Sequence, residues 1–151
     1  MGILTLVVWI ATVSFGLSLL GNWVARGGLG RQGGRPGWGA GVPPPYFPAP
    51  MILLHATLAT GGLVVFTLYL MVDSNPLAWL ALLMLMPVDL LGLGMFTRWL
   101  GSRRTRRLAT VPGVVVPAES RIPLALVVCH GLLASATVIL VFLVAIGVGG
   151  S

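Results

Sequence analysis

Two histidines, His55 and His130, are the residues whose type and spacing most readily indicate chemistry. Each follows a proline that opens a long apolar run, Pro50 in the first run and Pro123 in the second. The pattern His-x-x-Leu-Ala begins at both histidines, so the two runs resemble copies of each other. Because an ionisable side chain is costly inside a bilayer, a matched pair of histidines in such runs indicates a functional site.

The composition is that of an integral membrane protein. Of the 151 residues, 57% are hydrophobic and 8% are charged, whereas a soluble domain is about 25% charged. Four apolar stretches reach the length of about 20 residues that a helix needs to cross a bilayer. We predict spans at residues 3–24, 50–72, 76–100 and 123–148, which form a single all-α membrane domain over residues 1–151. No soluble catalytic domain is expected.

The arginines indicate how the spans are oriented. All nine basic residues are arginine, and they lie in or beside two connections, the Gly/Pro-rich residues 25–49 and the Arg-rich residues 101–122. The positive-inside rule places both connections in the cytoplasm and both termini outside. Trp23 and Trp99 are then expected at the inner membrane interface. The arginine-only basic content, together with 21 glycines and 11 prolines, favours a high-GC bacterial source, so we expect the bacterial inner membrane. The net charge of +6 reflects orientation rather than nucleic-acid binding.

The spans form a repeat of two tandem helical hairpins with the same orientation. Each hairpin has a basic connection, followed by a histidine early in its second helix. Parallel repeats of this kind are related by a pseudo-twofold axis along the membrane normal. We therefore predict a four-transmembrane-helix bundle, with His55 and His130 in one layer on diagonally placed helices and facing each other across the bundle axis.

A haem is the cofactor that best suits such a pair, because its iron takes two axial imidazoles from opposite sides. The positions four and seven residues after each histidine are small, which leaves room for a flat macrocycle. These small positions are Ala59, Gly62, Ala134 and Thr137. The sequence thus predicts one b-type haem with His55 and His130 as axial ligands, and Arg98 and Arg121 as partners of its propionates.

Asp89 is the one carboxylate inside a predicted span. Three roles are open to it. It could accept a hydrogen bond from a histidine N–H and orient that ring. It could instead belong to a proton or quinone site, which makes a quinone the second candidate cofactor. Finally, it could be a protonated acid that bonds a helix backbone.

The preferred function is electron transfer by a small subunit of a larger, respiratory-type membrane complex, without independent catalytic activity. One alternative is a haem-free accessory subunit whose histidines only bond neighbouring helices. Another is a small transporter with a proton path centred on Asp89. Direct binding of a transition metal is disfavoured, because Cys129 is adjacent to His130 and on a helix its side chain points about 100° away.

Overall fold

A computed structural model describes residues 1–25, 47–106 and 118–148, with the backbone alone at residues 105, 106 and 118. These residues form helices, and the links from α2 to α3 and from η1 to α4 are two residues long. The elements in chain order are α1 (Gly2–Ala25), α2 (Ala49–Val72), α3 (Asn75–Arg106), the short 3-10 helix η1 (Ala118–Arg121) and α4 (Leu124–Ala145).

The four α-helices are long and apolar enough to cross a membrane, as predicted. Large apolar side chains point outward along their length, among them Met71 at 75%, Leu90 at 72% and Ile3 at 69% exposure. Such a surface is costly in water and favourable against lipid tails. The chain is therefore a multi-pass membrane protein built as a four-helix bundle.

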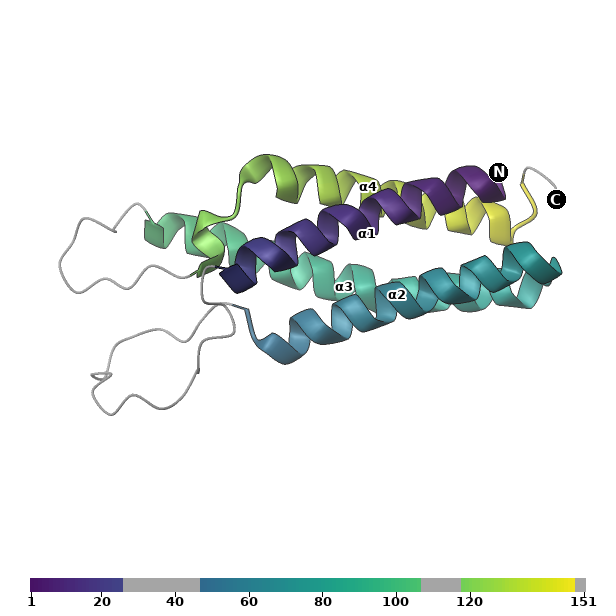
Figure 1. The fold of residues 1–151 in the computed structure, drawn as a ribbon, viewed down its shortest axis with the longest axis horizontal. Coiled ribbons are helices and arrows are strands. Elements are labelled where there is room, and N and C mark those ends of the chain that lie inside the picture. Colours follow the sequence, from purple (N-terminus) through teal and green to yellow (C-terminus); the bar gives the residue numbers. More distant parts are fainter. Residues whose placement is uncertain (26–46, 107–117, 149–151) are drawn as a thin grey trace.

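The helices form two close pairs, α1 with α4 and α2 with α3, and both termini lie at one end of the bundle (Figure 1). The pairing of α2 with α3 follows from the two-residue link between them. Asp73 ends α2 in the left-handed conformation (φ 49°), and its N–H bonds the carbonyl oxygen of Tyr69 at 2.8 Å. The helices of each predicted hairpin also contact each other, although less extensively.

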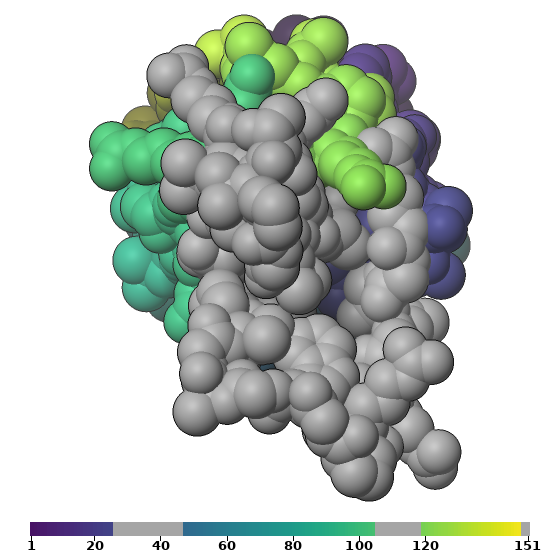
Figure 2. All heavy atoms as spheres, turned by 90° about the vertical axis from the view of Figure 1, so that its left-hand side faces the viewer, coloured from purple at the N-terminus to yellow at the C-terminus, as the bar shows by residue number. Residues whose placement is uncertain are grey.

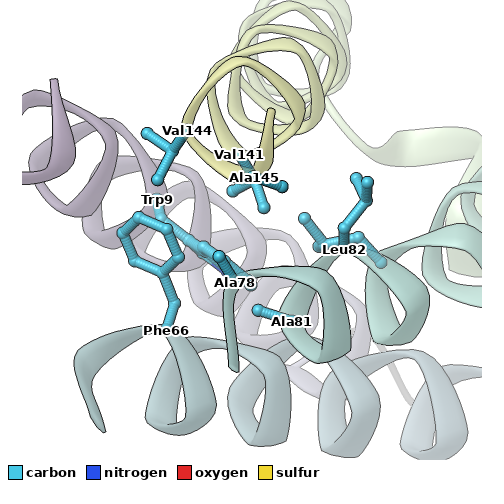
Figure 3. Close-up of a cluster of buried hydrophobic side chains, with 9 residues drawn as sticks. Trp9, Phe66, Ala78, Ala81, Leu82, Val141, Val144 and Ala145 are labelled. Carbon is cyan, nitrogen blue, oxygen red and sulfur yellow. The ribbon is translucent and has the colours of Figure 1, made fainter. Parts of the chain in front are cut away.

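A hydrophobic core fills the end of the bundle that carries the termini. The rings of Trp9 and Phe66 lie 5.7 Å apart between centroids, and α4 packs against them (Figure 3). The other buried members of this core are Ala78, Ala81, Leu82, Leu85, Val141, Val144 and Ala145. Helices in a membrane associate through close packing, and the small alanine side chains of this core let the helices approach one another closely.

A second hydrophobic cluster closes the opposite end and contains Trp23, Phe47, Trp99 and Ile122. Trp23 and Trp99 are only 3% and 2% exposed, so they do not serve as the interfacial anchors that we expected. They pack inside the bundle, where aromatic rings bury more apolar area than they could at the interface. The guanidinium carbon of Arg103 lies 5.0 Å from the centre of the Trp99 ring and covers it.

The third helix is longer than predicted, because α3 continues to Arg106 instead of ending near residue 100. Arg103 and Arg104 therefore lie on a helix rather than in a loop. Cations are favourable near a helix C-terminus, which explains the extension. Figure 2 looks onto this end of the bundle, where the end of α3 and the residues that precede α4 reach the surface. We call this the arginine end, since Arg103, Arg104 and Arg121 are exposed there.

Candidate functional site

The two histidine helices begin in matched ways, more closely than the sequence indicated. The N-cap of α2 is Pro48 and not Pro50, and the N-cap of α4 is Pro123. Their backbone angles are nearly equal, with φ −63° and ψ 129° at Pro48 and φ −61° and ψ 135° at Pro123. Pro50 fits within the first turn because the N–H groups there need no helical partner. Each histidine consequently lies seven residues beyond its N-cap proline, about 10 Å along the helix.

The two imidazole rings meet across the bundle. The ring centroids of His55 and His130 are 6.3 Å apart, and the ring planes are inclined by 61°. The rings come from α2 and α4, which are not a closely packed pair. The prediction that the histidines share one layer on diagonal helices and face each other is thus confirmed.

Each ring is oriented by a main-chain carbonyl of a neighbouring helix. His55 Nδ1 lies 3.0 Å from the carbonyl oxygen of Val88 in α3, and His130 Nδ1 lies 3.0 Å from that of Thr12 in α1. A carbonyl oxygen can only accept, so Nδ1 carries the proton in both rings and Nε2 keeps a lone pair. Within the described ranges, neither Nε2 has a hydrogen-bond partner. Both side chains are half-buried.

A glycine lies against each ring, one turn beyond the bonded carbonyl. A Cβ atom at Gly16 would come within 3.1 Å of His130 Cε1, and one at Gly92 within 3.4 Å of His55 Cε1. Neither glycine was among the site residues predicted from the sequence. A signal was present, since the spacing Gly-x6-Trp occurs at Gly16 and at Gly92, and elsewhere in the chain only at Gly2.

These glycines extend the repeat to the first helix of each hairpin. Residues 12, 16 and 23 of α1 correspond to residues 88, 92 and 99 of α3, each pair 76 positions apart. One carbonyl, one glycine and one buried tryptophan are supplied by each helix. The histidine layer therefore has pseudo-twofold symmetry in its hydrogen bonds as well as in its rings.

Two of the four predicted small positions serve helix packing in the adjacent layer. Gly62 makes room for Trp9, whose Cζ2 atom would lie 3.1 Å from a Cβ at that position. Thr137 Oγ1 lies 2.9 Å from Thr12 Oγ1 in a buried hydrogen bond between α4 and α1. Ala59 and Ala134 are half-buried one turn from the histidines. The small side chains at these two positions remain compatible with a ligand.

The charged residues lie outside the contacts between the rings. Asp89 is half-buried on α3 beside Val88, and the carbonyl of Val88, not the Asp89 carboxylate, accepts the bond from His55 Nδ1. Arg98 and Arg121 are exposed toward the arginine end. Cys129 is exposed. Among the described residues, no three His, Cys, Asp or Glu side chains form a group that could hold a metal ion directly.

The two rings have the donor chemistry and the centroid separation that axial ligation of a haem iron requires. A metal with one imidazole on each side needs roughly 6 Å between ring centroids, since each metal–nitrogen bond is about 2 Å. The observed 6.3 Å matches this requirement. Ligating histidines commonly donate the other N–H to a carbonyl, which both rings do here.

A buried carboxylate that the sequence analysis overlooked lies at the arginine end. Glu119 is 0% exposed, and its Oε1 accepts a hydrogen bond from the N–H of Phe47 at 3.1 Å. This bond joins the segments that lead into α4 and α2. The proximity of Glu119 to Pro123 in the sequence was the available signal, because a carboxylate beside a helix start often accepts main-chain N–H groups.

Together, the fold and the histidine layer define a small four-helix membrane protein with a symmetric pair of inward histidines. No protein-family model, curated protein or solved structure matches the chain.

Proposed function

We propose that the bundle binds one b-type haem between His55 and His130 and transfers electrons within a larger complex of the bacterial inner membrane. The observation that carries the proposal is the pair of Nε2 atoms, which have no hydrogen-bond partner among the described residues, on rings whose centroids are 6.3 Å apart. An imidazole whose Nδ1–H is held by a carbonyl presents the form of Nε2 that binds a metal.

The protein's own part is to hold two rings in fixed orientations. The carbonyls of Thr12 and Val88 set the tautomer, and Gly16 lets α1 approach the His130 ring more closely than a residue with a Cβ would. The haem would supply a one-electron redox couple, whose potential depends on the ligands and the burial. Because the chain has only two histidines, a second bis-histidine haem cannot form in the other leaflet. A partner subunit or a quinone must complete an electron path across the membrane.

The exposed arginines support the proposed orientation. Arg103, Arg104 and Arg121 lie at the end opposite both termini, so the positive-inside rule places that end in the cytoplasm. The histidine layer, about 10 Å from the N-caps, is then in the cytoplasmic leaflet.

A haem-free accessory subunit is the second candidate, and the same hydrogen bonds favour it. The bond from His55 to Val88 joins α2 to α3, and the bond from His130 to Thr12 joins α4 to α1. Such bonds between membrane helices stabilise by about 0.6 to 2 kcal/mol each. In this case the histidines would be packing groups, and the subunit would stabilise the complex that contains it.

The deciding experiment is an absorption spectrum of protein purified from a haem-replete host, first oxidised and then reduced with dithionite. The haem proposal predicts a Soret band that shifts on reduction, with one haem for each chain. A protein that folds and purifies without a Soret band contradicts the proposal and leaves the accessory function. Co-purification of a larger membrane complex supports a subunit role, whereas a stable solitary chain in mild detergent contradicts it.

A further inference from the structure

The arginine end contains three buried side-chain polar atoms without hydrogen-bond partners, and no other buried side-chain nitrogen or oxygen among the described residues lacks one. They are Nε1 of Trp23, Nε1 of Trp99 and Oε2 of Glu119. A buried N–H without an acceptor costs about 1 to 3 kcal/mol, so folded proteins rarely leave one unpaired. Here the indole N–H groups of two equivalent tryptophans are both unpaired. Neither bonds the Glu119 oxygen, so the three atoms do not satisfy one another.

The two indoles are related by the same repeat as the histidine layer. Trp23 follows Gly16 by seven residues in α1, and Trp99 follows Gly92 by seven residues in α3. Seven residues of helix correspond to about 10 Å along the bundle. Each glycine lies against a histidine ring, so the indole N–H groups lie below the histidine layer, on the side of the arginine end.

We infer that Trp23 and Trp99 donate their indole N–H groups to the two propionates of the haem proposed above, and this inference rests on that proposed function. A b-type haem carries both propionates on one edge, in positions that the symmetry of the macrocycle relates. Two donors related by the pseudo-twofold axis match this pair, one donor for each carboxylate. The separation of the two layers suits the reach of a propionate from the centre of the macrocycle.

The assignment changes which residues are expected to bind the propionates. The sequence analysis selected Arg98 and Arg121, but both side chains are exposed at the surface. The indoles of Trp23 and Trp99 are buried, at 3% and 2% exposure. A hydrogen bond to a carboxylate is strong where water is excluded, because the competing hydration is absent. Arg98 and Arg121 then contribute positive charge near the propionates from the surface of the arginine end.

The test compares haem b with its dimethyl ester, in which the propionates have no charge. The full-length protein is purified without haem from a haem-deficient host, and the dissociation constants of both compounds are measured by titration. We expect the unmodified protein to prefer haem b. The double variant Trp23→Phe/Trp99→Phe should reduce this preference about ten- to one-hundredfold, because it removes the N–H donors and keeps aromatic rings.

Trp9→Phe is the matched control, since Trp9 is equally buried at the other end of the bundle and should leave the preference unchanged. If the double variant fails to insert, each single variant should show about half of the logarithmic effect. A protein that binds haem b with the same preference after substitution contradicts this inference and leaves the proposed function standing, with water as the partner of the indoles. A protein that binds neither compound overturns the proposed function, and the inference with it.

Discussion

The imidazole of His130 donates its Nδ1 proton to the carbonyl oxygen of Thr12 at 3.0 Å. This bond fixes the direction of a lone pair on Nε2 inside the bundle, and it repeats between His55 and Val88. Thr12 is also hydrogen-bonded to Thr137 of the same neighbouring helix through its hydroxyl group. Thr12 thereby positions the His130 ring through its carbonyl group and joins α1 to α4 in the adjacent layer through its hydroxyl group.

Substitution of either histidine should have equivalent spectroscopic effects. His55→Ala and His130→Ala each remove one axial ligand, so we expect loss of the haem or conversion to a five-coordinate, high-spin spectrum. Absorption and electron paramagnetic resonance spectra measure the change. Cys129→Ala is the control, because Cys129 adjoins His130 in the sequence but is exposed. An unchanged bis-histidine spectrum in either histidine variant rules out the axial assignment.

Gly16→Ala should disturb the site, whereas Gly21→Ala in the same helix should not. The new Cβ at position 16 would lie 3.1 Å from His130 Cε1, but a Cβ at position 21 meets nothing within 4 Å. Gly21→Ala should raise stability by about 0.5 to 1 kcal/mol through helix propensity. Gly16→Ala should lose that gain and weaken haem binding, because the ring must move away from its carbonyl. Haem titration and thermal unfolding in detergent distinguish the two variants.

Gly92→Ala provides a finer comparison within the repeat. A Cβ there would lie 3.4 Å from His55 Cε1, which is an ordinary van der Waals contact. We therefore expect Gly92→Ala to be tolerated in the same haem titration. Equal damage from Gly16→Ala and Gly92→Ala would show that the difference in ring contact does not control the site.

Glu119 should stabilise the arginine end through its bond to Phe47. Glu119→Ala removes the carboxylate that accepts this buried bond, so we expect a loss of about 1 to 3 kcal/mol. Glu119→Gln keeps an acceptor oxygen at this position and should lose less. Unfolding of both variants in mixed micelles of mild detergent and dodecyl sulfate measures the difference. If Glu119→Gln is as unstable as Glu119→Ala, the carboxylate charge rather than the hydrogen bond is required.

The arginine end should face the cytoplasm. In a Cys129→Ala background, a single cysteine is introduced at exposed Asn75, on the side of the termini, or at exposed Arg104, at the other end. A membrane-impermeant thiol reagent applied to intact cells should label Asn75→Cys alone, and permeabilised cells should show labelling at both positions. Labelling of Arg104→Cys in intact cells would reverse the proposed orientation.

Much of the fold could be predicted from the sequence because bilayer solvation imposes simple rules. Apolar runs such as residues 50–72 are long enough to span a membrane, and main-chain groups in lipid must be paired within a helix. The matched patterns after His55 and His130 indicated the repeat and the shared layer, which the ring separation of 6.3 Å confirms. The helix ends were predicted less well, since prolines at positions 48 and 50 are both acceptable near a helix start.

The contacts around the histidines depended on the tertiary structure. Every residue has a main-chain carbonyl, so the residue types at Thr12 and Val88 could not indicate that their carbonyls accept the histidine N–H groups. The role of Gly16 and Gly92 is evident only from the imidazole rings that lie against them. Trp23 and Trp99 have the residue type and the position near a span end that are typical of interfacial anchors, yet packing buries them inside the bundle. The sequence alone determined that two histidines lie at one depth in a four-helix membrane bundle. Rotation of each helix about its own axis, which is set by the packing of its neighbours, decided which atoms surround them.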